Sequence, residues 1–353
     1  MPAPAPIRVL LIGTGFGAKV HAPAFAFDPD FRLVGVASGR RENAESVAKQ
    51  HGIPFAGDDW KRMLDEVEAD LVSIVTPVDL HYPMARAALE RKRHVLCEKP
   101  FAVNLAQAKE LAALARSQGV VNVVNHEFRY QPARAALTRL VTDGVLGRIE
   151  HIAIQDRIPG WARDPSRRLT WLSDRHRGGG FLGALGSHHV DSLLLWAGPV
   201  RRVLCRLRTI AATASGVGVA HHAISADDCF TMVLEFRSGA IAVVDLFGGS
   251  RARRDRFEVF GDADAVAIQG DRLYRPKGDG TDEAIPIPAD LALPATPEAA
   301  LLAPFRVMAG KIKAAIRDGA PITPTFADGV EIQKILDAAR MSDQAGGWVE
   351  IEE

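Results

Sequence analysis

The feature that most constrains this chain is a glycine-rich turn that directly follows a short apolar run. Residues 7–12, IRVLLI, are rich in leucine and β-branched side chains, which predicts a central strand of a parallel sheet with helices on both faces. The turn then reads Gly13, Thr14, Gly15, Phe16, Gly17 and Ala18, a G-x-G-x-x-A pattern. Its position between a strand and a helix favours a nucleotide-binding turn over an ordinary glycine-rich connection.

The small residues of this turn each have a physical role. Gly13 permits a tight turn, Gly15 lets a pyrophosphate approach the backbone, and Ala18 lets the helix pack closely on the strand. The N-terminus of the following helix then faces the phosphates. We therefore expect a dinucleotide to contact residues 13–18.

Strands and helices alternate through the first third of the chain. We expect strands at 31–38, 71–75, 94–97 and 120–125, and helices at 42–51, 82–91 and 105–118. This rhythm predicts an α/β fold with an N-terminal Rossmann dinucleotide-binding domain over residues 1–124.

The rest of the chain, 125–353, is expected to form an α+β domain. Strands without intervening helices are expected at 201–208, 228–236, 240–246 and 257–260, which predicts a large, mostly antiparallel sheet. The proline-rich stretch 276–298 is predicted to be a surface connection. Helices are expected near 304–317 and 328–341. The last helix could pack against either the second domain or the N-terminal domain.

The end of the second strand bears on the choice of dinucleotide. An NAD site would place Asp or Glu there to accept hydrogen bonds from the ribose hydroxyls, but the sequence has Ser38, Gly39, Arg40 and Arg41. A 2′-phosphate fits the Ser38 hydroxyl and a guanidinium. We therefore expect NADP(H) to be favoured, with NAD(H) as the alternative if both arginines are solvated residues that open the next helix.

Two more motifs follow strands of the predicted sheet, at the carboxyl ends where ligands bind. Their residues, expected to line the cofactor site, are Thr76, Pro77 and His81 after the third strand and Glu98, Lys99 and Pro100 after the fourth. Pro100 is expected to fix the turn that holds the Lys99 ammonium, and the peptide bond before Pro100 could be cis or trans. Lys99 is the leading catalytic candidate, although a lysine beside a carboxylate is also typical of a surface ion pair.

Charge and cysteine content exclude several classes of protein. Lys+Arg and Asp+Glu both total 43, with no charged tail, so we expect neither a nucleic-acid nor a membrane-surface partner. The 3 cysteines have no short spacing, no apolar run is long enough to span a bilayer, and no secretory leader is recognisable. We expect a cytoplasmic protein.

A metal site is not expected. His221 and His222 precede Asp227 and Asp228, but their spacing fits no helical or hairpin zinc pattern. A turn before a strand explains this run better.

Taken together, the motifs resemble those of the glucose-fructose oxidoreductase/inositol dehydrogenase (Gfo/Idh/MocA) family over nearly the whole chain. The matching elements are GTGFGA, TPxxxH, CEKP, the turn from Arg129 to Pro132, GGG followed by G-x-H-x-x-D, and the segment from Thr325 to Gly329. The resemblance implies a Rossmann domain and an open-faced, largely antiparallel sheet domain. It also implies a nicotinamide-dependent dehydrogenase or reductase that acts on a sugar or polyol, and a homodimer or homotetramer joined through the sheet.

The resemblance further implies roles for single residues. Lys99 and His188 match the family's catalytic lysine and histidine, and Arg129 is placed with the cofactor-binding residues. Ala184 departs from the pattern, because inositol dehydrogenase-like members carry Asp at this position, one helical turn before the histidine. Without this acid we expect the reaction to be slower or shifted in its pH dependence, or another carboxyl group such as Glu127 or Asp191 to take its place. A non-redox role is a further alternative. We favour a structural role for Asp191.

Substrate contacts and the reaction class stay open. Glu127, Trp161, Trp171, Arg177 and His188 are the candidate substrate-binding residues, although the two tryptophans are equally well explained by packing and Arg177 by solvation. Two functions compete with a dehydrogenase: a hydrolase or lyase that retains its nicotinamide and oxidises transiently, and a regulatory protein that binds the dinucleotide without turnover.

Overall fold

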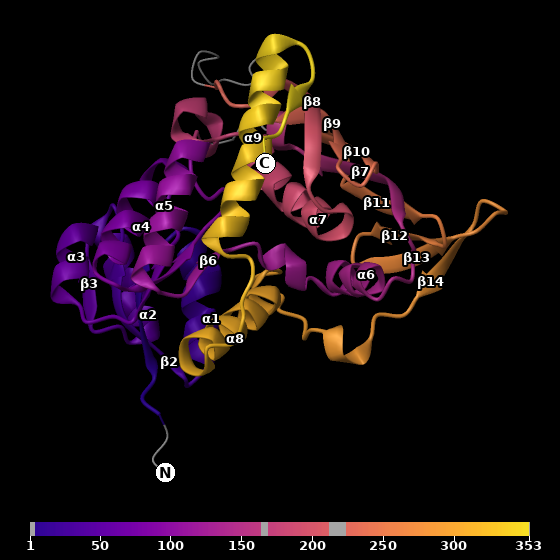
Figure 1. Cartoon of the computed structure of the whole chain (residues 1–353). Coiled ribbons are helices and arrows are strands. Elements are labelled where there is room, and N and C mark those ends of the chain that lie inside the picture. The colour runs from indigo at the N-terminus through magenta and orange to yellow at the C-terminus, as the bar shows by residue number, and fades with distance from the viewer. Residues whose placement is uncertain (1–3, 164–168, 212–223, 353) are drawn as a thin grey trace. The chain divides into compact units, whose positions relative to one another are not determined.

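The structure is a computed structural model that describes residues 4–163, 169–211 and 224–352. The chain divides into two compact units, Met1–Tyr130 with Leu293–Glu331, and Gln131–Ala292 with Ile332–Glu353 (Figure 1). The first unit therefore includes residues 293–331, which the predicted domain boundary after residue 124 assigns to the second domain. The physical reason is helix α8 (Leu302–Asp318), whose buried residues join the same hydrophobic core as strands β1 and β2.

The first unit contains a parallel sheet of six strands in the order β3-β2-β1-β4-β5-β6. Its strands are β1 (Ile7–Ile12), β2 (Phe31–Ala37), β3 (Phe55–Gly57), β4 (Leu71–Ile74), β5 (His94–Cys97) and β6 (Asn122–Val124). Its other helices are α1 (Ala22–Phe27), α2 (Arg41–His51), α3 (Trp60–Glu66), α4 (His81–Glu90) and α5 (Leu105–Gln118). The predicted Rossmann fold is confirmed.

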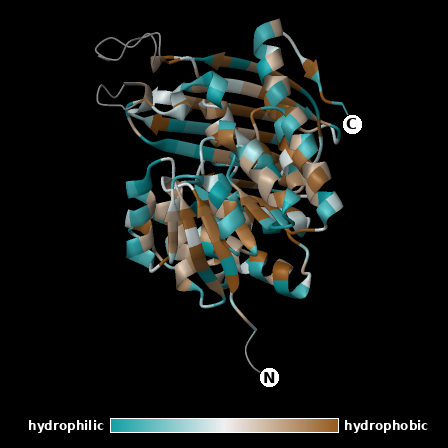
Figure 2. Ribbon diagram, turned by 90° about the vertical axis from the view of Figure 1, so that its left-hand side faces the viewer, coloured by the Kyte–Doolittle hydropathy of each residue, from teal (hydrophilic) through white to brown (hydrophobic). Residues whose placement is uncertain are grey.

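Helices cover both faces of this sheet, which explains its apolar strands. Leu10 and Ile12 of β1 pack in a core with residues of α3, α4 and α5, whereas Val9 and Leu11 pack in a second core with residues of α1, α2 and α8. Figure 2 shows the strands of this sheet in mainly hydrophobic colours. Strands that are buried on both faces need no polar positions.

The second unit contains a sheet of nine strands in the order β14-β13-β12-β11-β7-β10-β9-β8-β15. The strands are β7 (Ile149–Pro159), β8 (Val200–Arg208), β9 (Cys229–Phe236), β10 (Ile241–Ser250), β11 (Arg254–Gly261), β12 (Ala265–Gln269), β13 (Arg272–Pro276), β14 (Asp282–Ile285) and β15 (Val349–Glu350). Among these strands β7 and β10 pair in parallel, while the other neighbours are antiparallel. The sheet is mixed, and mostly antiparallel as predicted.

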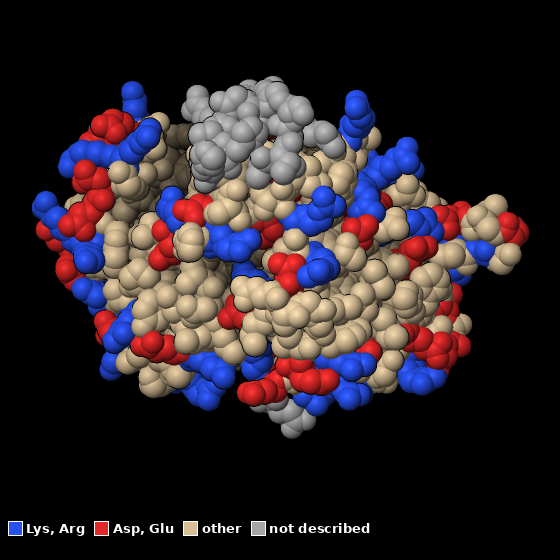
Figure 3. Space-filling view, turned by 90° about the horizontal axis from the view of Figure 1, so that it is seen from above, with Lys and Arg blue, Asp and Glu red and all other residues tan. Residues whose placement is uncertain are grey.

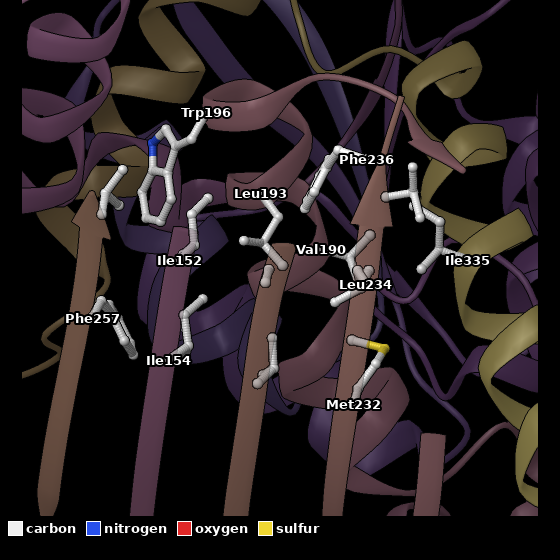
Figure 4. Close-up of a cluster of buried hydrophobic side chains, with 14 of the residues drawn as sticks. Ile152, Ile154, Val190, Leu193, Trp196, Met232, Leu234, Phe236, Phe257 and Ile335 are labelled. Atoms are coloured by element: carbon white, nitrogen blue, oxygen red, sulfur yellow. The ribbon is translucent and has the colours of Figure 1, made fainter. Parts of the chain in front are cut away.

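Three helices pack on one face of this sheet. They are α6 (Pro132–Thr142), α7 (Ser187–Ala197) and the C-terminal part of α9 (Phe326–Ala345). Figure 4 shows Val190, Leu193 and Trp196 of α7 over Ile152, Ile154 and Leu234 of the strands. This core fixes the position of α7, which carries His188.

Strand β7 was not expected from the sequence. Ile152 and Ile154 alternate with half-buried or exposed residues, but the next inward position is the buried carboxylate Asp156. A charged residue on the buried face interrupts the period-2 pattern that would have shown the strand. The stretch 276–298 likewise holds the edge strand β14, whose residues are largely exposed.

No helix among the described residues is long and apolar enough to cross a membrane. On the face shown in Figure 3, lysine and arginine side chains lie beside aspartate and glutamate side chains. Some exposed charges are paired along helices, as in Arg62 with Glu66 at 2.7 Å and Arg86 with Glu90 at 3.0 Å.

Candidate active site

The glycine turn after β1 has the space that a dinucleotide needs. Gly13 has a φ of 111°, and a Cβ there would lie 2.2 Å from the carbonyl oxygen of Val75. Gly15 is exposed, and no atom lies within 4 Å of the place where its Cβ would be. Gly13 thus lets the turn close against β4, and Gly15 leaves room for a pyrophosphate, so the turn fits a dinucleotide.

The residue that lets the following helix pack closely on β1 is Gly17, not Ala18 as predicted. A Cβ on this buried residue would lie 3.3 Å from a methyl group of Leu11, whereas Ala18 is half-buried. The expected helix begins as a π-helical turn (Gly17–His21) and continues as the short α1. Phe16 and Ala18 pack at the edge of the core shared with α8.

The proposed 2′-phosphate site lies at the end of β2. The Oγ1 atom of Thr14 lies 2.8 Å from Oγ of Ser38, so the glycine turn and the end of β2 are joined. Arg40 precedes α2 with an exposed side chain, and Arg41 pairs with Glu45 at 2.9 Å on the surface of α2. Arg41 is therefore a solvated residue that opens α2, as the alternative to a phosphate site requires. Arg40 is the better candidate for contact with a 2′-phosphate.

His81 is fully buried and links the two loops that follow β4 and β5. Its Nε2 atom lies 2.9 Å from the carbonyl oxygen of Thr76, and its Nδ1 atom lies 3.1 Å from that of Pro100. Burial lowers the pKa of the ring, so the neutral form is favoured. The structure thus gives His81 contacts to the loops on which Thr76, Pro77 and Lys99 stand. The Lys99–Pro100 peptide bond is cis.

Glu98 is the centre of a buried hydrogen-bond network. The Oε1 atom of Glu98 lies 2.9 Å from Nε2 of His21 and accepts a hydrogen bond from the Asn125 amide at 2.5 Å. The other ring nitrogen of His21 lies 2.8 Å from the hydroxyl of Ser73, and the backbone N–H of Lys99 donates to Oε2 of Glu98 at 3.3 Å. Glu98 therefore holds the turn of Lys99 in place.

This network keeps Glu98 ionised. Burial by itself raises the pKa of Glu98, but the hydrogen bond to His21 and the charges of His21 and Lys99 bring it below its ordinary value. His21, Ser73 and Asn125 were not predicted as site residues. Ser73 is the single polar residue of β4, whereas His21 and Asn125 lie near other polar residues and carry no distinct signal.

Glu127 lies in the same region and differs sharply from Glu98. It is fully buried, and neither carboxyl oxygen has a hydrogen-bond partner among the described residues. Burial and the negative charge of Glu98 raise the pKa of Glu127 to about 8, against the opposing effect of Lys99. The neutral, protonated form of Glu127 is therefore favoured, close to the turn that carries Lys99.

Glu127 opens a short 3-10 helix (Glu127–Tyr130) that contacts the segment before α9. Arg129 donates a hydrogen bond to the Thr323 hydroxyl at 3.0 Å, and the Tyr130 hydroxyl donates to the Thr323 carbonyl at 3.3 Å. The described contacts of Arg129 thus include protein groups within the first unit, and its contact with a cofactor stays a prediction.

In the second unit, His188 stands near the start of α7 and is buried. The chain reaches α7 through a π-helical turn (Leu182–Gly186), whose first N–H donates to the Asp227 carboxylate at 2.7 Å. Gly180 has a φ of 111°, and a Cβ there would lie 2.1 Å from an oxygen of Asp227. The glycine run therefore makes room for the acid that fixes the start of the helix.

Asp227 and Asp228 have structural contacts rather than metal contacts. Burial raises the pKa of Asp227 to about 6. Asp228 accepts hydrogen bonds from the backbone N–H groups of Ile210 and Ala211 at 2.7 and 2.8 Å. Within the described part of the chain no group of three or more His, Cys, Asp or Glu residues can hold a metal ion. His221 and His222 lie outside the described residues.

Asp191 belongs to a buried charge cluster that includes Arg134. Burial lowers the pKa of Arg134 to about 10, and the charges of Asp156 and Asp191 oppose this effect. His189 contacts Asp156 at 3.4 Å, and Arg253 contacts the same carboxylate at 3.2 Å. The charge of Asp191 thus acts on a buried guanidinium, and its structural role stays a prediction. Ala184 lies in the π-helical turn before His188, so no carboxylate stands there.

The remaining substrate candidates lie in short 3-10 turns before the glycine run. Trp161 packs on Phe181 with ring centroids 5.1 Å apart, which supports its packing role. Trp171 and Arg177 are half-buried. Their contact with a substrate stays a prediction.

Known proteins resemble this chain over most of its length. Residues 7–126 match the family model "Oxidoreductase family, NAD-binding Rossmann fold", and residues 135–267 match the "GFO/IDH/MocA C-terminal domain". Levoglucosan dehydrogenase of Pseudarthrobacter phenanthrenivorans is 26% identical over 98% of this chain and 98% of its own length. D-glucoside 3-dehydrogenase of Escherichia coli is 34% identical over 54% of each chain.

Solved structures show the same fold. Levoglucosan dehydrogenase in complex with NADH and levoglucosan is 25% identical, with a TM-score of 0.87 over 98% of this chain and 100% of that one. An oxidoreductase domain protein from Kribbella flavida is 27% identical, also with a TM-score of 0.87, over 99% of this chain and 100% of that one.

Proposed function

Because this chain belongs to the GFO/IDH/MocA oxidoreductase family and is a nicotinamide-dependent oxidoreductase, we propose that it transfers a hydride between the nicotinamide and a carbon of a sugar or polyol. The observation that carries this proposal is the position of Lys99. It follows β5 at the carboxyl edge of a Rossmann sheet, on a turn fixed by Glu98 and His81. The names of the relatives, levoglucosan dehydrogenase and D-glucoside 3-dehydrogenase, support a carbohydrate substrate.

The glycine turn and the end of β2 would hold the dinucleotide. The open space over Gly15 suits the pyrophosphate, and Ser38 with Arg40 suits a 2′-phosphate, so NADP(H) is the favoured form. When bound, the nicotinamide supplies the hydride donor or acceptor. Thr76, Pro77 and Lys99 stand on loops at the same edge of the sheet.

Lys99 and His188 have separate roles in this proposal. The Lys99 ammonium holds the substrate oxygen and stabilises negative charge that develops on it. The family pattern assigns exchange of the hydroxyl proton to His188, since an imidazole titrates near neutral pH. Ala184 favours one competing function, a regulatory protein that binds the dinucleotide without turnover, because it removes a carboxylate that would assist His188.

A fluorescence titration with NADPH and NADH tests the cofactor assignment. NADPH is expected to bind more tightly, and Arg40→Ala is expected to weaken its binding by about 1–3 kcal/mol with little effect on NADH. Arg41→Ala, which removes an arginine that pairs with Glu45, is the matched control. Equal binding of both dinucleotides would contradict the NADP preference, and binding of neither would contradict the function.

Turnover on a panel of sugars and polyols tests the chemistry. The wild type is expected to reduce the dinucleotide with at least one member, and Lys99→Met is expected to lose at least about 100-fold in kcat. Tight dinucleotide binding with no turnover over the whole panel would instead support the regulatory function.

A further inference from the structure

Glu127 is a buried acid that the roles of Lys99 and His188 do not use. The register of the parallel sheet places it beside Lys99: Cys97 pairs with Val124 across β5 and β6, and the N–H of Asn125 donates to the carbonyl of Cys97 at 2.7 Å. The chain continues from one strand end to Glu98 and Lys99 and from the other to Glu127. The side chain of Lys99 acts electrostatically on Glu127.

The surroundings of Glu127 are those of a group that exchanges a proton. It is completely excluded from solvent, and neither carboxyl oxygen has a hydrogen-bond partner among the described residues. A purely structural buried carboxyl group is normally hydrogen-bonded, as Glu98 is by His21 and Asn125. Two adjacent carboxyl groups with different protonation states are typical of acid–base sites.

We propose that Glu127 exchanges a proton with Lys99 during turnover, and that this pair, in place of His188, carries the proton of the substrate oxygen. In carbonyl reduction the substrate oxygen takes a proton from the Lys99 ammonium while its carbon receives the hydride. The resulting Lys99 amine then takes the proton of the Glu127 carboxyl group. The Glu127 carboxylate regains a proton from water after the product has left the site. In hydroxyl oxidation the proton moves in the opposite direction. This role rests on the proposed function, and Glu127 acts through Lys99.

Infrared difference spectroscopy of the protein without dinucleotide tests the protonation state. The wild type is expected to show the C=O band of a buried protonated carboxyl group that disappears as the pH rises through about 8. Glu127→Gln is expected to lose this band, and Glu110→Gln, at an exposed helix position, to keep it. Lys99→Met is expected to shift the midpoint to higher pH, because it removes a positive charge that favours the carboxylate. No band assignable to Glu127, or a midpoint that Lys99→Met leaves unchanged, would overturn the proposal.

The pH profile of turnover tests the role in catalysis. Glu127→Gln is expected to lower kcat by about 10- to 100-fold with little change in KM or in dinucleotide affinity, and to remove one limb of the pH–kcat profile. Glu127→Asp is expected to restore part of kcat. A Glu127→Gln profile identical to that of the wild type would overturn the proposal. Because the infrared experiment needs neither cofactor nor substrate, failure of the proposed function would show separately, as absence of dinucleotide binding.

Discussion

Two glutamates near Lys99 differ in charge because their surroundings differ. Both are buried, but Glu98 receives hydrogen bonds from Asn125 and the backbone of Lys99 and faces His21. The carboxyl oxygens of Glu127 have no side-chain hydrogen-bond partner among the described residues, and the negative charge of Glu98 acts on them. The same side chain is therefore a fixed carboxylate in one place and a neutral acid in the other.

The raised pKa of Glu127 predicts how stability changes with pH. The folded state keeps this proton up to about pH 8, while an unfolded chain releases it near the ordinary value of 4.5. Between these values the folded state binds more protons, so the free energy of unfolding falls as pH rises. Glu127→Gln is expected to remove about 1–3 kcal/mol of this fall between pH 5 and pH 9. Urea unfolding at both pH values measures it.

Glu110→Gln is the control for this measurement, since that carboxylate is exposed and pairs with Arg86. It should keep the pH dependence of the wild type. Parallel stability curves for the wild type and Glu127→Gln would contradict the prediction.

The glycine turn predicts opposite effects for two similar substitutions. Gly13→Ala places a Cβ 2.2 Å from the Val75 carbonyl at a φ of 111°, and is expected to destabilise the fold by about 3 kcal/mol or more. Gly15→Ala meets no atom within 4 Å, so it is expected to leave stability within about 0.5 kcal/mol and to weaken dinucleotide binding instead. Thermal unfolding and cofactor titration separate the two effects, and equal destabilisation would count against this reading of the turn.

At the scale of elements, the start of α7 depends on a distant acid. The Asp227 carboxylate comes from the chain just before β9, yet it accepts the hydrogen bond of Leu182 at the head of the helix that carries His188. Gly180 leaves the space for it. One glycine of the GGG motif, Gly180, is thus needed because a side chain there would collide with Asp227.

Asp227→Ala is expected to destabilise the protein by about 1–2 kcal/mol, because the N–H of Leu182 loses its partner. Asp227→Asn keeps an acceptor oxygen and is expected to lose less. Since burial raises the pKa of Asp227 to about 6, its ionisation lowers stability as pH rises from about 4 to 6, and Asp227→Asn should not show that change. Chemical unfolding of the three proteins at pH 4 and pH 7 tests this, and an alanine variant as stable as the wild type would refute it.

At the scale of the whole molecule, the face of the nine-stranded sheet opposite α6 and α7 predicts self-association. Across this face Leu204 pairs with Val233, Val233 with Val243 and Val243 with Ala153, which places a row of half-buried apolar side chains on the outer surface. Ile241 on the same strand is 41% exposed. We expect a homodimer or homotetramer joined through this face, because such a row is costly to leave in water.

Val243→Lys is expected to convert that oligomer to a monomer, while Val243→Thr, of similar size and without charge, leaves it intact. Light scattering after size-exclusion chromatography measures the mass. A wild-type monomer of about 38 kDa would rule out the expected assembly.

The first unit was largely predictable because its strands are short apolar runs and its turns carry glycine. Buried polar residues are harder to predict. Asp156 occupies an inward position of β7 and hides that strand, and His21 is one histidine beside an apolar run, with no distinct signal. Cores are recognised from periodic apolar residues, and buried charges break that period.

The amino-acid sequence was enough to predict the Rossmann fold, the dinucleotide turn and the motif that carries Lys99, since each depends on residues close together in the chain. Only the three-dimensional fold shows that Glu98 is held by His21 and Asn125, that the carboxyl oxygens of Glu127 are buried with no side-chain hydrogen bond among the described residues, and that residues 293–331 complete the first unit. The physical reason is that burial and hydrogen-bond partners set the charge of an acid, and these come from segments far apart in the sequence.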